Sequence, residues 1–274
     1  MGKGWKMLKY RLIATDLDGT LLDSGGQIPD YAKEAVGEYH RLGGLFTIAT
    51  GRMDGTAGRF AKELNVRIPI VTYNGGKVID LNSGRVLSEA FLNCEKAVEA
   101  YKALKRLNKD MVVYFGGLPY VSGITDTILK YKKRINFEVY LIEDVHKVIV
   151  PETKKILVID PKGEFDLMKS IISKVFGNSL NCVVSDEEYF EILPVGVSKG
   201  RGLQTIADSL GIPMEEVIAI GDYYNDISMI RAAGLGIAVR NAKAEVLAAA
   251  DYITSSNDEN GVAQVVRKVI SKVL

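Results

Sequence analysis

The sequence LIATDLDGT, which runs from Leu12 to Thr20, decides the fold of this chain. Its apolar part stops abruptly at Thr15 and Asp16. A short apolar run bounded in this way is typical of a buried parallel strand that ends in a polar loop. We therefore predict the first strand here, with Asp16 and Asp18 at its carboxyl end.

The residues that follow alternate between helical and strand patterns. From Pro29, apolar residues recur every three or four positions up to Leu42, which predicts a helix. Apolar runs at residues 45–49 and 68–72 predict two further strands, with a short helix around residues 60–64 between them. Strands that alternate with helices form a parallel sheet with right-handed crossovers and helices on both faces.

The alternation breaks off after residue 76 and returns near Glu191. Residues 78–81 and 85–87 flank a turn and predict a hairpin, and mixed strand and helix patterns follow it. After Glu191 the sequence predicts helices at 203–210, around 230–233 and at 262–273, and strands at 217–220 and 235–239. We therefore predict an α/β domain, residues 1–87 and 191–274, interrupted by an inserted α+β domain, residues 88–190.

The composition is that of an average soluble globular protein. Of the 274 residues, 47% are hydrophobic and 25% are charged, and the formal net charge is +1. This balance argues against a disordered or collagen-like chain and predicts no steering toward nucleic acid or an anionic membrane. The first ten residues lack the apolar segment of a secretory signal, and Cys94 and Cys182 are too few for a disulfide framework, so we expect a cytoplasmic protein. His40 and His146 lie outside every motif, and we assign them no role.

The first candidate site is the carboxylate pair Asp16 and Asp18. Residues two apart on an extended chain point to one side, and the carboxyl end of a parallel strand faces the ligand crevice of an open α/β sheet. Two converging carboxylates repel each other unless a proton or a cation lies between them, which favours a hard divalent metal such as Mg²⁺. An Asx-turn that only closes the loop is the alternative.

A second acidic cluster, GDYYND, starts at Gly221 directly after a predicted strand. If this strand neighbours the first one, Asp16, Asp18 and Asp222 could share one ion, because neighbouring strands lie about 4.8 Å apart. Asp226 opens the next predicted helix, and capping of that helix is its alternative role.

Two further positions predict phosphate contacts. Thr50, in the sequence ATGR, ends the second predicted strand, where its hydroxyl and the backbone N–H groups around Gly51 can hold phosphate oxygens. A helix N-cap is the alternative for Thr50. Lys199, in the sequence VSKG, begins a predicted helix, where a cation opposes the helix dipole unless an anion is bound there.

These four pieces, in this order and with a long insertion between the second and the third, resemble the haloacid dehalogenase-like (HAD) phosphohydrolases. The chain is most similar to the Cof-like subgroup, in which a large cap interrupts a Rossmann-like core with a parallel sheet. DLDGTLL at Asp16–Leu22 and GDYYNDISM at Gly221–Met229 are long, specific matches, whereas TGR and SKG gain their specificity from this context. The resemblance covers essentially the whole chain.

The resemblance implies catalytic roles for Asp16, Asp18, Thr50 and Lys199. Asp16 would be the nucleophile that forms an aspartyl-phosphate, and Asp18 would protonate the leaving alkoxide and later deprotonate the attacking water. Mg²⁺, Lys199 and the Thr50 hydroxyl would stabilise the charge on the transferred phosphoryl group. The metal would be held by the carboxylates of Asp16 and Asp222 and by the backbone carbonyl of Asp18.

Contacts around these residues are implied as well. Asp226 is expected behind the metal or bridged to it through water, and Asn225 and Gly51 are expected near the phosphate. The residues implied to face the substrate are Leu17, Arg52, Asn74 and Gly75. A plain turn is the alternative for Asn74 and Gly75. Tyr223 departs from the family pattern, which has smaller or polar residues at this position, and we expect it to pack against the cap rather than to narrow the site.

We therefore expect a Mg²⁺-dependent phosphatase of small phosphorylated metabolites, with sugar phosphates favoured because a large cap sequesters small substrates. A phosphomutase with the same chemistry and a non-catalytic phosphometabolite-binding protein are the alternatives, and the intact residue set argues against the second. A dehalogenase is disfavoured because it does not require an acid such as Asp18. No nucleic-acid or membrane partner is expected. The basic residues 132–134 could meet an anionic substrate, but a solvated helix face is favoured.

Overall fold

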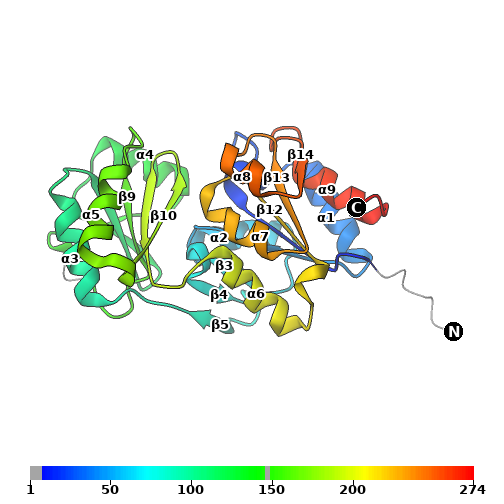
Figure 1. Cartoon of the computed structure of the whole chain (residues 1–274), viewed down its shortest axis with the longest axis horizontal. Helices are drawn as coiled ribbons and strands as arrows, with labels where there is room; N and C mark the ends of the chain where they lie inside the picture. Colours follow the sequence, from blue (N-terminus) through cyan, green and yellow to red (C-terminus); the bar gives the residue numbers. More distant parts are fainter. Residues whose placement is uncertain (1–7, 146–148) are drawn as a thin grey trace. The chain divides into compact units, whose positions relative to one another are not determined.

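The computed structural model of the chain describes residues 8–145 and 149–274 (Figure 1). Internal contacts divide the chain into two compact units. The described residues of the first unit fall within Met1–Arg52, Ala57–Ser88 and Ser198–Leu274. The second unit, called the inserted unit below, consists of Met53–Thr56 and Glu89–Val197. His146, to which the sequence gives no role, lies outside the described residues.

The first unit is built around a parallel sheet with the strand order β14-β13-β12-β1-β2. Its strands are β1 (Leu12–Thr15), β2 (Leu45–Ile48), β12 (Val217–Gly221), β13 (Leu235–Val239) and β14 (Tyr252–Thr254). In the register of the sheet, Thr15 of β1 lies opposite Ile220 of β12 and Ile48 of β2. The polar residues that follow β1 and β12 therefore leave the same edge of the sheet side by side.

Helices cover both faces of this sheet. They are α1 (Asp30–Arg41), α2 (Asp54–Glu63), α6 (Lys199–Leu210), α7 (Ile227–Ala232), α8 (Ala244–Ala249) and α9 (Gly261–Ile270). Helix α1 packs against α9, and α6 packs against α7. Every residue of β1 is buried, and because neighbouring residues of a strand face opposite sides, both faces of the sheet must be covered.

The predicted third strand is less integrated into this sheet than the sequence suggests. Strand β3 (Ile70–Thr72) meets the chain after β2 through a parallel bridge between Ala49 and Val71. It pairs antiparallel with β4 (Lys77–Ile79), and with β5 (Val86–Glu89) these strands form a separate small sheet. The reason is the tight turn between β3 and β4, which sends the chain straight back along β3.

The inserted unit has its own sheet and its own core. The strand order is β10-β11-β9-β6-β7-β8. The strands are β6 (Asp110–Phe115), β7 (Leu118–Val121), β8 (Tyr140–Leu141), β9 (Lys155–Ile159), β10 (Asn181–Asp186) and β11 (Tyr189–Leu193). The helices are α3 (Cys94–Lys105), α4 (Asp126–Ile135) and α5 (Asp166–Phe176), of which α3 packs against α5. The apolar side chains of this unit form a cluster separate from the core around β1.

The expected boundary between residues 190 and 191 is wrong, because it falls inside β11. This strand forms a hairpin with β10 and also pairs with β9, so it belongs to the inserted unit. The inserted unit ends at Val197 instead, directly before the helix that begins with Lys199. Strands β11 and β14 and helix α8 were not predicted; β14 and α8 are too short to show a clear period.

Helix α4 carries the basic residues 132–134. Lys132 pairs with Glu138 at 2.6 Å, and Arg134 pairs with Asp186 at 2.5 Å. Both pairs lie within the inserted unit and are consistent with the favoured interpretation as a partly solvated helix face. Cys94 and Cys182 are half-buried free thiols. Among the described residues, no helix combines the length and the apolar character that crossing a membrane requires.

Candidate active site

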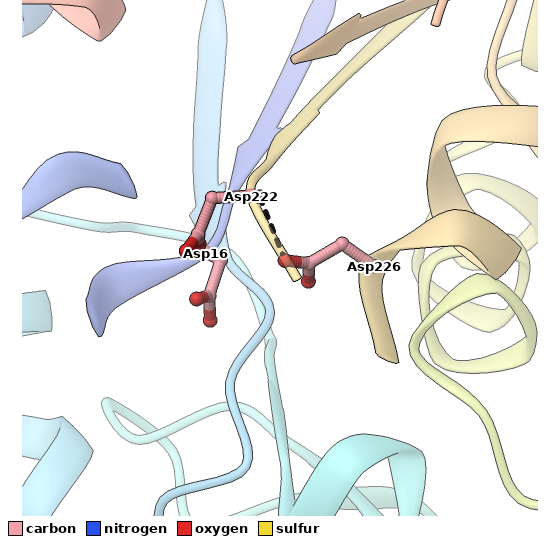
Figure 2. Close-up of side chains that lie close together, drawn as sticks. All are labelled: Asp16, Asp222 and Asp226. Atoms are coloured by element: carbon pink, nitrogen blue, oxygen red, sulfur yellow. Dashed lines mark hydrogen bonds between the residues drawn. The ribbon is translucent and has the colours of Figure 1, made fainter. Parts of the chain in front are cut away.

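Three carboxylates meet where β1 and β12 end. Asp16 follows β1 and Asp222 follows β12, and the backbone N–H of Asp16 donates to the carbonyl of Ile220 at 2.9 Å. Asp226 lies one turn further along, before α7, and Figure 2 shows it hydrogen-bonded back to Asp222. One carboxylate oxygen from each of Asp16, Asp222 and Asp226 lies within 4.8 Å of the others.

A buried lysine joins two of these carboxylates. Lys199, the first residue of α6, is 1% exposed. Its Nζ donates to Asp16 Oδ1 at 2.7 Å and to Asp226 Oδ1 at 2.6 Å. The Ser198 side chain caps α6 by accepting from the N–H of Arg201. The positive charge of Lys199 at the start of this helix is balanced by the two carboxylates. This contact fixes Asp16 Oδ1 and places the Lys199 ammonium beside the residue that the sequence resemblance implies as nucleophile.

Asp226 organises the loop that carries Asp222. Its Oδ2 accepts the backbone N–H groups of Asp222 and Tyr223, both at 3.0 Å, while its Oδ1 binds Lys199. Asp226 makes no cap hydrogen bond to α7, but it does take part in the cap of the short 3-10 helix Tyr224–Asp226, because its side chain accepts the N–H of Tyr223. The capping alternative therefore holds for this short helix, beside the contact with Lys199. Asp226 thus also ties the β12 loop to the lysine.

The electrostatics of this cluster favour a cation. Burial raises the pKa of Asp16 to about 7, with Lys199 opposing the rise and the charges of Asp226 and Asp18 adding to it. Burial, Asp226 and Asp16 raise the pKa of Asp222 to about 8, although Thr20 and Lys199 oppose this. Burial alone would lower the pKa of Lys199, but Asp16 and Asp226 raise it above its usual value.

Three carboxylates matched by one ammonium leave an excess of negative charge in a buried place. Carboxylate oxygens are the ligands that hard divalent cations select, and such an ion would balance the excess. The residues present therefore fit a divalent cation, with Asp16 and Asp222 as carboxylate ligands.

Asp18 corrects a sequence expectation. Its carboxylate does not converge with that of Asp16 in the acidic cluster; Arg52 holds it instead, with Nε donating to Oδ2 and Nη2 to Oδ1, both at 2.7 Å. The physical reason is the turn Leu17–Leu21, which begins at the residue between the two aspartates, so their side chains do not point to one side although each has extended backbone angles. The pair also gives Arg52 a contact that the sequence did not predict.

The expected phosphate-binding loop and the loop after β3 lie against each other. The Thr50 hydroxyl accepts the N–H of Arg52 at 3.1 Å, so Thr50 closes its own loop rather than capping α2, which begins at Asp54. The N–H of Asn74 donates to the carbonyl of Thr50 at 3.0 Å, and Asn225 Nδ2 donates to Asn74 Oδ1 at 2.9 Å. Asn74 and Asn225 therefore connect the loops that follow β2, β3 and β12.

Leu17 and Tyr223 have different surroundings from those of the polar residues. The Leu17 side chain is fully buried in the core of the first unit. A contact of Leu17 with substrate would therefore have to come from its backbone and stays a prediction. Tyr223 packs edge-on against Tyr224, with ring centroids 4.9 Å apart, and the Lys243 ammonium lies 5.2 Å from its ring. These contacts lie within the first unit, so the expected packing of Tyr223 against the inserted unit stays a prediction.

One residue of the site was missed by the sequence reasoning. Thr20 is 1% exposed, and its hydroxyl donates to Asp222 Oδ1 at 2.6 Å. The signal was its place in the DLDGT motif, where a buried hydroxyl two residues after Asp18 has few partners other than a carboxylate.

Gly75 tests how tightly these loops fit together. A Cβ at Gly75 would lie 2.1 Å from the carbonyl oxygen of Ser198, and the residue has a φ of +98°. We expect Gly75→Ala to lower the free energy of unfolding by about 2–5 kcal/mol, the sum of the backbone strain and the forced displacement of Ser198. Chemical denaturation measures this.

Gly84→Ala is the matched control. Gly84 also has a positive φ, +72°, but a Cβ there would meet no atom within 4 Å. It should cost only the backbone strain, about 1–2 kcal/mol. Equal losses for the two variants would contradict the close packing of Gly75 on Ser198.

Comparisons with known proteins show the family of this chain. The sequence profile of the haloacid dehalogenase-like hydrolases matches residues 13–266. The stress response protein YhaX of Bacillus subtilis strain 168 is 31% identical over 271 residues, which cover 95% of this chain and 93% of that protein. From the same strain, 5-amino-6-(5-phospho-D-ribitylamino)uracil phosphatase YcsE is 30% identical, with 94% of each chain covered. A solved haloacid dehalogenase-like hydrolase from Bacteroides thetaiotaomicron has a TM-score of 0.85 at 30% identity and covers 95% of this chain and 99% of its own.

Proposed function

Because this chain belongs to the haloacid dehalogenase-like hydrolases and is a phosphatase, we propose that it hydrolyses small phosphorylated metabolites with Mg²⁺ through an aspartyl-phosphate on Asp16. The observation that carries this proposal is the cluster of Asp16, Asp222 and Asp226 around the buried Lys199. A carboxylate held by a lysine at the end of a buried strand is fixed in place, as a nucleophile must be.

In the proposed first half-reaction, Asp16 attacks the phosphorus atom of the ester. A bond forms between a carboxylate oxygen of Asp16 and phosphorus, and the bond from phosphorus to the ester oxygen breaks. Lys199 binds Asp16 Oδ1, so Oδ2 is the proposed attacking atom. Lys199 and the Thr50 hydroxyl stabilise the negative charge of the transferred group.

Asp18 is the proposed proton carrier for both halves of the reaction. As an acid it gives its proton to the leaving alkoxide, and as a carboxylate it then takes a proton from the water that attacks the aspartyl-phosphate. This second attack releases inorganic phosphate and restores Asp16. The bidentate contact with Arg52 suits the carboxylate form of Asp18, so the acid form requires that contact to loosen.

The residues that would hold Mg²⁺ are Asp16 and Asp222 through their carboxylates and Asp18 through its backbone carbonyl. When bound, the ion would neutralise the excess negative charge of the carboxylates and of the substrate phosphate. Asp226 supports this set from behind, because its two oxygens are engaged by Lys199 and by the backbone of the β12 loop. Thr20 orients Asp222 from the other side.

The proposed substrates are small phosphate monoesters, with sugar and sugar-alcohol phosphates favoured. The insertion of a whole folding unit between the loop that carries Thr50 and the helix that begins at Lys199 supports a substrate that is enclosed while it reacts. YcsE, which is named for a substrate with a phosphorylated ribityl group, supports testing phosphorylated polyols first.

The experiment is phosphate release from a generic aryl phosphate and from a panel of sugar and polyol phosphates, with Mg²⁺ and after removal of metal by a chelator. We expect release with Mg²⁺ and a loss of at least about a hundredfold without it, the scale of losing the main charge-stabilising group. Equal rates with and without metal would contradict the metal role. Conversion of one phosphate ester into another without free phosphate would identify a phosphomutase instead.

A further inference from the structure

Two carbonyl groups of the loop after β1 are held by asparagines from distant parts of the chain. Asn241 Nδ2 donates to the carbonyl oxygen of Gly19 at 2.8 Å. Asn257 Nδ2 donates to the carbonyl oxygen of Leu22 at 2.9 Å. Asn241 follows β13, and Asn257 lies between β14 and α9. The loop that carries Asp16 and Asp18 is therefore held by the loops that follow β13 and β14, two strands that do not neighbour β1 in the sheet.

Asn257 also fixes the orientation of Asn241. The backbone N–H of Asn257 donates to Asn241 Oδ1 at 3.0 Å. A backbone N–H can only donate, so the atom of Asn241 that faces it must be the carbonyl oxygen of the amide. The amide nitrogen of Asn241 then has to point at Gly19. Asn257 is 9% exposed and is itself anchored on Leu22, which makes this brace rigid.

The same loop after β13 also contacts the other carboxylate-bearing loop. The N–H of Lys243 donates to the carbonyl oxygen of Asp222 at 3.0 Å. Residues 241–243 thus bind Gly19 on one side and Asp222 on the other. Gly19 and Asp222 are also packed directly against each other, because a Cβ on Gly19 would lie 2.5 Å from Asp222 Oδ2.

Gly19 is the point of the β1 loop that most needs such a constraint. Glycine has the greatest backbone freedom of any residue, and Gly19 sits between Asp18 and Thr20 at a φ of +75°. A rotation there would turn the peptide groups on both sides of it. It would move the backbone of Asp18 and would pull the Thr20 hydroxyl away from Asp222.

We propose that Asn241, braced by Asn257, is a positioning residue for catalysis: it fixes the β1 loop against Asp222 so that the ligand atoms on the two loops stay in register. It acts through the Gly19 peptide. The inference rests on the proposed function for its effect on turnover, but the geometry it describes is measurable without turnover. The inference predicts that the site requires the hydrogen bond from Asn241 Nδ2 and not merely a side chain of this volume.

The test uses Asn241→Asp and Asn241→Leu in the full-length protein. The aspartate keeps the oxygen that accepts from Asn257 but places a second oxygen against the carbonyl of Gly19; the leucine removes the donor without adding charge. For both variants we expect kcat with Mg²⁺ to fall by about 10- to 100-fold, with KM changed less than about threefold, at temperatures well below unfolding.

The charge-matched control is Asn82→Asp. Asn82 is an exposed residue whose Nδ2 donates to the carbonyl oxygen of Val66 at 3.3 Å. This variant should keep the wild-type kcat.

Amide hydrogen exchange of the metal-free proteins gives the second readout. Residues 16–23 should exchange about tenfold faster in both Asn241 variants than in the wild type, because one hydrogen bond that holds the loop is lost, while residues 110–115 of β6 keep their rate. Unchanged exchange in residues 16–23 would overturn the inference, as would a full kcat in either variant. If the wild type releases no phosphate from any ester, the proposed function fails, and the exchange result alone decides the positioning role.

Discussion

Asp16→Asn is expected to lower kcat for phosphate ester hydrolysis by about 10⁴-fold or more, on the scale of losing a covalent nucleophile, while the protein stays folded. The amide is nearly the same size as the carboxylate, and its oxygen can still accept from the Lys199 ammonium. What it loses is the negative charge that attacks phosphorus and part of the charge that would hold the metal. Initial rates of phosphate release measure the effect, and circular dichroism checks the fold.

The matched control for Asp16→Asn is Asp160→Asn in the inserted unit. Asp160 is also a buried carboxylate, 1% exposed, and it binds the Lys109 ammonium at 2.8 Å. Its neutralisation should reduce stability but leave kcat unchanged, because Asp160 belongs to the core of another unit. A rate for Asp16→Asn within tenfold of the wild-type rate would rule out Asp16 as the nucleophile.

Lys199→Met is expected to have the second-largest effect, on both rate and stability. Methionine fills a similar volume, so the change mainly removes the charge. Two buried carboxylates, Asp16 and Asp226, then lose their shared partner, which should lower the free energy of unfolding by about 3–5 kcal/mol. Loss of the ammonium from the transition state should raise the barrier by a further 2–4 kcal/mol or so, about 30- to 1000-fold in kcat.

Lys155→Met separates these two effects. Lys155 is a buried lysine of the inserted unit, 4% exposed, whose Nζ donates to the buried Glu191 at 2.7 Å. Breaking this pair should destabilise the protein to a similar extent, since it too leaves a buried carboxylate unpaired. Its kcat at a temperature where the variant is folded should remain that of the wild type. A Lys199→Met enzyme with less than a twofold loss in kcat would show that Lys199 is structural only.

The position of the site could be predicted from the sequence because it depends on strand ends. The apolar run before Asp16 and the one before Asp222 both predict buried strands, and parallel strands place their carboxyl ends at one edge of the sheet. The pairing of β1 with β12 confirms the neighbour relation that the shared ion requires. The roles of these residues as nucleophile and ligands stay predictions.

The directions of individual side chains could not be predicted in this way. The expected convergence of Asp16 and Asp18 assumes that the chain between them is extended. The turn that begins at Leu17 breaks that assumption, and Asp18 binds Arg52 instead. The third carboxylate of the acidic cluster is that of Asp226 rather than that of Asp18, because the short turn that carries Asp226 folds back over the end of β12. Turns of this kind depend on tertiary contacts that a local pattern does not contain.

The contacts of Asn241 and Asn257 show the same limit over a longer range. Both residues lie more than 200 positions from the carbonyl groups that they hold, and neither stands in a motif with a recognisable spacing. The boundary near residue 190 failed for a related reason, since β11 is fixed by its pairing with β9 and β10 rather than by its own sequence. Hydrogen-bond partners across a sheet become visible only once the strand order is known.

The most direct test of the central claim is to trap the covalent intermediate. Wild-type enzyme and Asp16→Asn would each be mixed with Mg²⁺ and a rapidly hydrolysed phosphate ester, quenched in acid within one turnover, digested and examined by mass spectrometry. The account predicts one added phosphoryl group on the peptide that contains Asp16 in the wild type, lost on treatment with hydroxylamine and missing in Asp16→Asn. A phosphoryl group on another residue, or turnover with phosphorylation of neither Asp16 nor any other carboxylate, would contradict it.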